Sequence, residues 1–306
     1  AVALALFPRY LILGHDLGSA AWHAWFYSLS SFNNAGFVID PEGLVPYAGD
    51  PWITMPIATA VFVGSLGFPV VLVLARRWRA PATWPLHTKL TLTTTLVLLL
   101  VSIVTIGAFE WTNPDTFGSM SSGERVQSSI FAGVMPRSGG FSTVDVGQMR
   151  ESTWFLQDLF MFVGGGSAST AGGIKVATLA ILILAALAEA RGDRDIEAFH
   201  RRIAPGTVRL AVAVLLAGLT LVFAATLALL TLTDEHLDHV LFEVISAFGT
   251  AGLSTGITPD LPDPAKYVLT GLMYAGRTGT MTLAAALALR ERRRMFRLPE
   301  ERPIVG

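Results

Sequence analysis

The chain has 306 residues, of which 52% are hydrophobic and only 15% are charged, and its formal net charge is −1. Soluble domains carry about 25% charged residues, so this composition indicates a membrane protein. The near-neutral charge excludes a strongly basic nucleic-acid binder. The absence of cysteine excludes disulfides, zinc thiolates and cysteine nucleophiles.

The N-terminal stretch is apolar but covers only 13 residues, whereas a membrane-spanning helix needs about 20. It begins at Ala1 without a charged region in front of it, so it does not resemble a signal peptide. We expect it to be the end of a longer hydrophobic helix, and the chain to be a fragment.

Several apolar segments are long enough to span a membrane. They are residues 52–75, 90–109, 209–232 and roughly 265–289. A further apolar segment, 153–190, is too long for one span and is interrupted by GGGSASTAGG at 164–173. Shorter, half-apolar stretches of a length typical of re-entrant helices lie at 20–33, 124–136 and 236–248.

Most of the 22 basic residues fall in three regions, which the positive-inside rule places in the cytoplasm. These are Arg76, Arg77, Arg79 and Lys89; Arg191, Arg194, Arg201, Arg202 and Arg209; and Arg290, Arg292, Arg293, Arg294, Arg297 and Arg302. Acidic residues prefer the opposite side, among them Asp16, Asp40, Asp50, Glu110, Glu124 and Asp238. An acidic outer mouth would concentrate cations. Any single acid is better explained by an ordinary solvated loop, so only the one-sidedness of the whole set is informative.

Three glycine-centred stretches repeat one pattern, each after a short helix between two spans. They read SLSSFNNAGFV at 28–38, AGVMPRSGGFS at 132–142 and VISAFGTAGLS at 244–254. Their glycines, Gly36, Gly140 and Gly252, recur 104 and 112 residues apart.

This pattern predicts an ion filter. A helix that ends halfway through the membrane favours a cation at its C-terminal carbonyls, and extended backbone after it can aim further oxygens at a central axis. Glycine allows the backbone angles and close approach that such a site requires. The predicted filter residues are Asn34, Ala35, Gly36, Phe37, Ser138, Gly139, Gly140, Phe141, Thr250, Ala251, Gly252 and Leu253. The alternative is that the glycines are helix caps or close-packing sites.

The motifs resemble those of the bacterial Trk/Ktr potassium-uptake family, most closely the Ktr membrane subunit. FNNAGF, RSGGFST and AFGTAGLSTG resemble its second, third and fourth filter segments, and the resemblance runs from about Trp22 to Gly306. It implies an all-α membrane protein whose repeated span–pore helix–span units surround a central pore, with re-entrant half-helices and a broken helix. Ser138-Gly139 departs from the Thr-Ala that is usual in the third filter, and Pro136 ends that short helix abruptly.

The resemblance also implies a division of the chain into repeats. Residues 1–79 would be the second pore repeat with a truncated first span, 80–195 the third with its intramembrane loop 164–173, and 196–290 the fourth. Residues 291–306 would be a cytoplasmic C-terminal tail, and the first repeat would lie before Ala1.

The sequence GGGSASTAGGIK, at 164–175, resembles the family's intramembrane loop, which acts as a gate beneath the filter. A helix made of small residues unwinds easily, and the backbone groups that this frees must line water or protein. The predicted gate residues are Gly164, Gly165, Gly166, Ser167, Ser169, Thr170, Gly172, Gly173, Lys175 and Arg277. A phosphate-binding loop is the alternative, but Gly173-Ile174-Lys175-Val176 lacks the Gly-Lys-Ser/Thr that it needs.

Two further groups of polar residues have open interpretations. Arg277 falls inside the last predicted span, where a charge is costly. The resemblance implies that it faces the pore near the gate, and a structural pairing with an acid or carbonyls is the alternative. His236, His239 and Glu243 lie on one helical face, which is compatible with a metal site or with the solvated start of the third short helix.

The resemblance implies a channel-like subunit for potassium uptake across the cytoplasmic membrane, with potassium or sodium as the transported ion and no cofactor in this chain. Its implied partners are a second copy, membrane lipid and a cytoplasmic nucleotide-binding ring that docks on the basic inner face. A sodium-permeable or proton/sodium-coupled transporter, a non-conducting fragment, and a membrane enzyme that uses 164–175 on a phosphate group are the alternatives. The sequence shows no catalytic constellation, so we do not expect an enzyme.

Overall fold

The computed structural model describes residues 1–279 and residue 286. Within them the chain is almost entirely helical, with one short β-hairpin. The α-helices are α1 (Val2–Ile12), α2 (Leu17–Phe32), α3 (Pro51–Leu66), α4 (Phe68–Arg77), α5 (Leu86–Glu110), α6 (Ser122–Val134), α7 (Glu151–Phe162), α8 (Val176–Arg191), α9 (Pro205–Leu232), α10 (Leu237–Gly249) and α11 (Asp263–Tyr274). The hairpin strands are β1 (Glu197–Ala198) and β2 (Arg201–Arg202).

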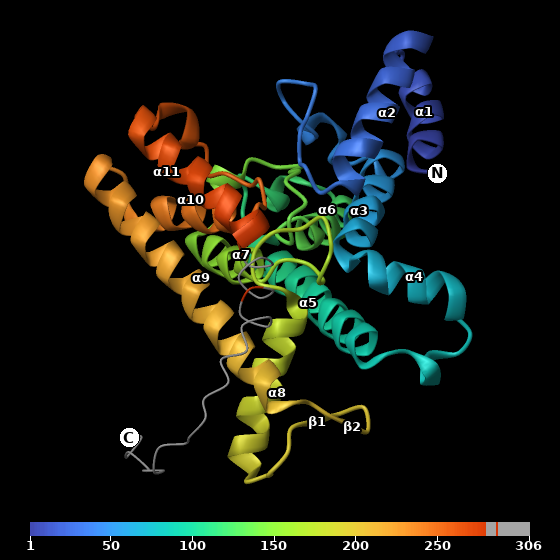
Figure 1. The fold of residues 1–306 in the computed structure, drawn as a ribbon. Coiled ribbons are helices and arrows are strands. Elements are labelled where there is room, and N and C mark those ends of the chain that lie inside the picture. The colour runs from blue at the N-terminus through green and yellow to red at the C-terminus, as the bar shows by residue number, and fades with distance from the viewer. Residues whose placement is uncertain (280–285, 287–306) are drawn as a thin grey trace.

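The helices form three consecutive groups, each with a short helix between two others. Helices α1, α2 and α3 pack on one another, as do α9, α10 and α11, and in the middle group α5 packs on both α6 and α7. In Figure 1 the first group lies on the right, the last group lies on the left, and α5 to α8 lie between them. Contacts between α3 and α6, and between α7 and α10, join the groups. This is the repeated arrangement of span, short helix and span that the sequence predicts.

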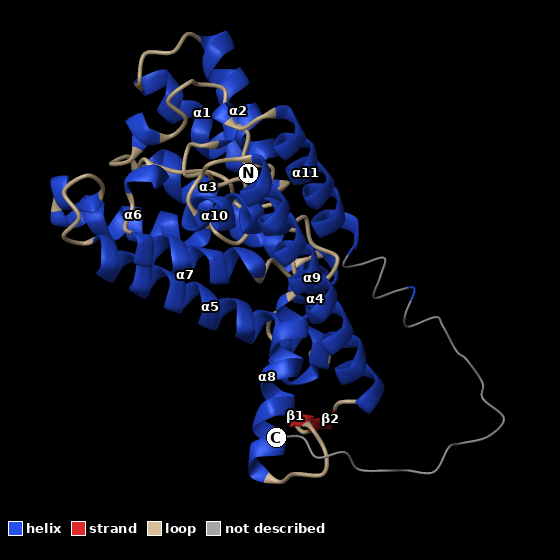
Figure 2. Ribbon diagram, turned by 90° about the vertical axis from the view of Figure 1, so that its left-hand side faces the viewer, coloured by secondary structure: helices blue, strands red, loops and turns tan. Residues whose placement is uncertain are grey.

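Two helices, α5 and α9, are each long and apolar enough to cross a bilayer alone. Many of their large apolar side chains are exposed, including Leu100, Val104 and Phe223. Exposed apolar residues along a long helix are expected where lipid replaces water as the solvent. The β-hairpin lies at the end of the molecule opposite α1 and α2 in both views (Figures 1 and 2).

The predicted span at 52–75 is wrong as a single straight helix. The chain breaks at Gly67, which has a φ of 90°, and α3 and α4 meet at an angle of 102°. Pro69, in the first turn of α4, lacks the amide that would continue the hydrogen-bond ladder of α3. The interruption predicted at 164–173 is present, because α7 ends at Phe162 and α8 begins at Val176.

The three short helices agree closely with their predicted positions, and capping side chains mark the starts of α2 and α6. Asp16 accepts hydrogen bonds from the Gly18 and Ser19 amides at the start of α2. Ser121 and Glu124 form a capping box on α6. The last predicted span is described only as α11 and the π-helical turn Ala275–Gly279, so most of 280–289 and the predicted tail at 291–306 lie outside the described residues.

Candidate ion filter and intramembrane loop

The three glycine-centred turns share one backbone conformation. The filter glycines have positive φ angles of 71° at Gly36, 74° at Gly140 and 83° at Gly252. The residue two positions earlier is also left-handed in every turn, with φ of 52° at Asn34, 69° at Ser138 and 48° at Thr250. Such angles are uncommon for residues other than glycine and are strained for a β-branched one. The sequence repeat is therefore also a repeat of backbone geometry.

The three filter glycines meet in space. A β-carbon added to Gly36 would lie 2.7 Å from the Cα of Gly140, and one added to Gly252 would lie 3.1 Å from the same atom. A β-carbon on Gly140 would in turn lie 2.9 Å from the carbonyl oxygen of Ala251. No side chain fits between backbones this close, which is why all three positions need glycine.

A serine hydroxyl holds the carbonyl after the glycine in two of the three turns. Ser30 donates to the carbonyl oxygen of Phe37 at 2.8 Å, and Ser246 donates to that of Leu253 at 2.5 Å. Val134 occupies the same repeat position in the remaining turn and has no hydroxyl. The hydroxyls fix the direction of carbonyl oxygens that follow the filter glycines.

The chain after the glycine is tied back to its own short helix. The buried carboxylate of Glu243 on α10 accepts from the Thr255 amide at 2.8 Å and from the Thr258 hydroxyl at 2.6 Å. Tyr27 on α2 donates to Asp40 at 3.1 Å. These contacts limit how far the turns can move away from the helices that carry them.

The interrupted segment between α7 and α8 forms a loop that packs on the break between α3 and α4. The Gly166 amide donates to the Ser65 carbonyl at 2.7 Å, and the Phe68 amide donates to the Ala168 carbonyl at 3.3 Å. At its far end, the Gly173 amide donates to the Gly276 carbonyl in the π-helical turn after α11, at 3.3 Å. The freed backbone groups of the loop thus find partners in protein, as backbone at membrane depth requires.

The loop also touches two of the three turns. Thr170 donates to the side-chain oxygen of Asn34 at 2.7 Å, and the Gly172 amide donates to the hydroxyl of Thr250 at 3.0 Å. Ser138 joins the network by donating to the Thr250 carbonyl at 2.8 Å. The predicted filter and gate residues therefore form one connected cluster.

The two predicted gate cations differ in their surroundings. Lys175 is buried and donates to the Ala171 carbonyl at 2.6 Å, which closes the end of the loop on itself. Arg277 is exposed on the π-helical turn and acts electrostatically on Lys175 as a like charge. A single π turn inside a helix is rare and is frequent at functional sites.

Sequence reasoning missed the burial of several charged residues, among them Glu110 and Arg137. Glu110, taken as an acid of the outer surface, is fully buried at the end of α5 and accepts from Asn113, Thr116, Thr153 and the Arg150 amide. Arg137 lies within the third motif and is only 2% exposed. Its guanidinium donates to the Thr95 carbonyl at 3.0 Å, which joins this turn to α5.

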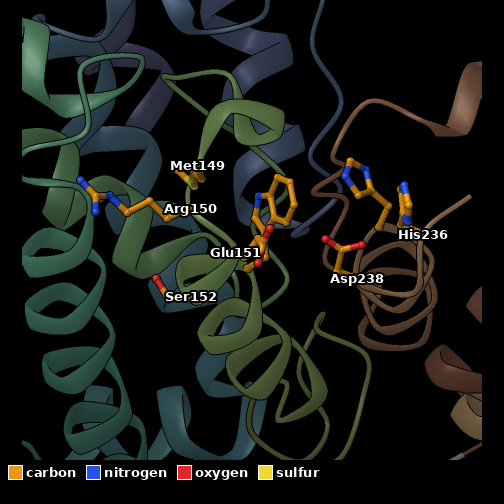
Figure 3. A pocket seen from close by; sticks show the side chains of 8 residues that line it. Met149, Arg150, Glu151, Ser152, His236 and Asp238 are labelled. Atoms are coloured by element: carbon orange, nitrogen blue, oxygen red, sulfur yellow. The ribbon is translucent and has the colours of Figure 1, made fainter.

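The histidine pair at the start of α10 lines a different site. His236, Asp238 and His239 line an open pocket of about 850 Å³ together with Arg150 and Glu151 at the start of α7. Figure 3 shows His236 and Asp238 on one side of it and Glu151 on the other. Glu243 is engaged with the turn that follows Gly252 and does not join them. Within the described part of the chain no three such side chains gather as metal ligands, so the metal interpretation gains no support.

Known proteins share this architecture. The structure superposes with a TM-score of 0.74 on a crystal structure of the potassium transporter TrkH from Vibrio parahaemolyticus, covering 94% of this chain and 62% of that one at 17% identity. The fold thus defines the class: an all-α membrane protein of repeated span–pore helix–span units. A family model described as TrkH, cation transport protein, matches residues 9–297, and the chain belongs to this family.

Curated relatives point the same way. The chain is 36% identical to a Ktr system potassium uptake protein B of Bacillus subtilis over 95% of its own length and 64% of the relative. It is 33% identical to the potassium/sodium uptake protein NtpJ of Enterococcus hirae over 93% of its own length and 64% of that protein. The chain therefore spans less than two thirds of these relatives. The resemblance drawn from the glycine motifs is confirmed, and the family is one of transporters rather than enzymes.

Proposed function

We propose that this chain is the ion-conducting part of a potassium-uptake subunit. One observation carries the proposal: three glycines at equal repeat positions meet, each in the same left-handed conformation and each after a short helix. The partial negative charge at three helix C-termini favours a cation there. Carbonyl oxygens of the following backbone can then replace its water shell. The names of the relatives supply the ion, potassium.

In this proposal the filter consists of residues 34–37, 138–141 and 250–253, and the loop at 164–173 together with Lys175 and Arg277 controls access to it. The contacts of Thr170 and Gly172 with the turns support a gate at this place. Lys175 and Arg277 would weaken the residence of a cation that has passed the filter, since like charges repel. The repeats would be divided as at 1–79, 80–195 and 196–290.

We infer the orientation from the charges and the partners from the resemblance to the family. The β-hairpin and its arginines lie at the end of the molecule that we assign to the cytoplasm of the cell, in accordance with the positive-inside rule. The same basic face would dock a cytoplasmic nucleotide-binding ring, and the subunit would act as a homodimer. Comparison of ring binding by the wild-type protein and by Arg201→Glu would test the docking.

Uptake into proteoliposomes tests the proposal directly. The full-length protein should carry potassium or rubidium down an imposed gradient. Gly140→Ser and Gly252→Ser should abolish the flux, whereas Gly271→Ser, at a site with no heavy atom within 4 Å of an added β-carbon, should not. Full flux in the Gly140 and Gly252 variants would refute the filter, and no flux in the wild-type protein would refute the function.

A sodium-permeable transporter is the second candidate, because one relative is named a potassium/sodium uptake protein. Competition of sodium with rubidium uptake distinguishes the two candidates. A protein selective for potassium should keep its rubidium flux in excess sodium.

A further inference from the structure

Side chains of the short helix α2 hold the chain that leaves the first filter turn. Ser30 donates to the Phe37 carbonyl at 2.8 Å, and Tyr27 donates to one oxygen of the Asp40 carboxylate at 3.1 Å. His23 lies one helical turn before Tyr27 on the same face, with its Nε2 3.4 Å from the other oxygen of that carboxylate. These side chains thus form a stripe along α2 that fixes the chain between Phe37 and Asp40.

The protons on His23 distinguish its contact from the others. Its Nδ1 lies 2.8 Å from the Ser19 carbonyl oxygen, which can only accept, so Nδ1 carries a proton. In the neutral imidazole, Nε2 is then a lone pair that faces the Asp40 carboxylate and cannot bond to it. A second proton, on Nε2, turns the same contact into a charge-assisted hydrogen bond. The bond between His23 and Asp40 therefore exists in one protonation state and is absent in the other.

The equivalent positions of the other repeats have no such bond. Gln127 precedes Gly140 by the same distance along the chain as His23 precedes Gly36, and its amide, which does not titrate, donates to the Ala48 carbonyl at 3.0 Å. His239 precedes Gly252 by this distance too, but its Nδ1 is buried without a hydrogen-bond partner among the residues that the structure describes.

The last filter turn is held by a contact of reversed polarity. There the helix supplies the acid, Glu243, and the chain after the glycine supplies the donors, which are the Thr255 amide and the hydroxyls of Ser254 and Thr258. Amides and hydroxyls keep their protons throughout the ordinary pH range, so these donors are always available. The donor at His23, in contrast, is lost when the imidazole becomes neutral.

Titratable groups face His23 from the segments packed around it. They are Tyr10 and His15 of α1, Tyr27 of α2 and Asp40 of the following chain, with Tyr47 against Tyr10. The His15 ring lies 4.8 Å from that of His23 between centroids, so a charge on His15 opposes one on His23, whereas the Asp40 carboxylate favours it. Arg9 pairs with Asp50 at 2.6 Å rather than with Asp40.

We propose that His23 is a positioning residue for the first filter turn, which it holds through Asp40 when its imidazole is doubly protonated. In the orientation inferred above, the start of α2 faces the outside, so the proton comes from the outer medium. Histidine changes its charge between about pH 5 and pH 8. The preference of uptake for potassium over sodium should therefore fall as the outer pH rises through this range. This inference rests on the proposed ion uptake.

Rubidium uptake by the full-length protein in proteoliposomes, measured against competing sodium at several outer pH values, tests the inference. In the wild-type protein the preference should fall at least about threefold between about pH 5 and pH 8. His23→Gln supplies an amide donor that does not titrate, so it should keep the high preference at every pH. His23→Phe, which has no donor, should show the low preference at every pH.

Further variants separate His23 from its neighbours. Asp40→Asn can accept from a protonated Nε2 or donate to a neutral one, so it should remove the pH dependence as well. His15→Gln and His239→Gln, which leave His23 and Asp40 in place, should keep it. The same pH dependence in the wild type and in His23→Gln would overturn the inference, as would its loss in His239→Gln. If His23→Phe does not fold, His23→Gln and Asp40→Asn still decide the result.

A second readout does not depend on flux. The chain contains no cysteine, so Val38→Cys, at an exposed position between Phe37 and Asp40, gives a unique thiol. Its rate of reaction with a maleimide is compared with the rate of the same thiol combined with His23→Gln, and the ratio at each pH cancels the titration of the thiol itself. The ratio should rise with the outer pH, because the chain is released only where His23 is present. A constant ratio would overturn the inference. Absence of flux in the wild-type protein together with the expected rise would refute the proposed function alone.

Discussion

Gly36 and Gly140 are in backbone contact, although 104 residues separate them: a β-carbon on either would lie 2.7 Å from the Cα of the other. The contact joins the ends of α2 and α6, which belong to different helix groups. It shows why the glycines matter together rather than singly, since each occupies the space that a side chain on the other would fill.

Gly140→Ala is expected to destabilise the protein by about 1–3 kcal/mol, because the new methyl group must displace backbone and the residue must keep a positive φ. Thermal unfolding of the detergent-solubilised protein measures this change. Gly271→Ala is the matched control, since a β-carbon there has no neighbour within 4 Å and no positive φ is needed. Equal melting temperatures for the two variants would contradict the contact.

Ser246→Ala is expected to weaken the turn of Gly252 by about 1 kcal/mol, the usual net worth of one hydrogen bond. The carbonyl of Leu253 would lose its fixed direction, so the preference for potassium over sodium in the uptake assay should fall. Ser30→Ala should act alike through Phe37, while Ser152→Ala, an exposed serine at the start of α7, should change neither quantity. A preference that is unaffected in both variants would show that these hydroxyls do not shape the filter.

Glu110→Ala is expected to cost at least about 2 kcal/mol, because it leaves several buried donors without an acceptor. Glu110→Gln should fall between the wild type and Ala, since an amide keeps one oxygen. Chemical unfolding of the three proteins gives the order. Exposed Glu151→Gln serves as the control, and a Glu110→Ala variant as stable as this control would argue against the buried network.

The start of α6 should respond to acid. Hydrogen bonds from the amide and hydroxyl of Ser121 hold the pKa of Glu124 below its ordinary value. The stabilisation is therefore fully present above the ordinary carboxyl pKa and is lost as the pH falls through the lowered value. An NMR titration of the Glu124 carboxyl carbon should show the lowered pKa, and a Ser121→Ala variant should return it toward the ordinary value. Glu124→Gln, which keeps a capping side chain that cannot titrate, should remove this part of the acid response.

Much of the architecture follows from local sequence. The short helices were predictable because a short, half-apolar stretch is followed by a glycine turn in each, as at Phe32 and Gly36. The interruption at 164–173 was predictable because a run of small residues lies within an apolar segment. In both cases the signal and the structure it produces lie within a few residues of each other.

The remainder depends on partners distant in the chain. Glu110 looks like a solvated acid, and two of the donors that satisfy its buried carboxylate, the Arg150 amide and the Thr153 hydroxyl, come some 40 residues later. The bend at Gly67 has a local signal in the sequence Gly67-Phe68-Pro69. The span at 52–75 was predicted from the hydropathy of the whole segment, which does not depend on where glycine and proline stand within it. The contacts of Thr170 with Asn34 and of Gly172 with Thr250 arise only once the repeats have folded together.

The bend at Gly67 has a mechanical consequence. Helix α4 runs almost perpendicular to α3, and the amide of its first residue, Phe68, donates a hydrogen bond to the carbonyl of Ala168 in the loop. Its other end carries Arg76 and Arg77, about 15 Å away by the helical rise. We therefore expect a force on those two arginines to be transmitted along α4 to the hydrogen bond between Phe68 and Ala168, where the loop contacts the helix.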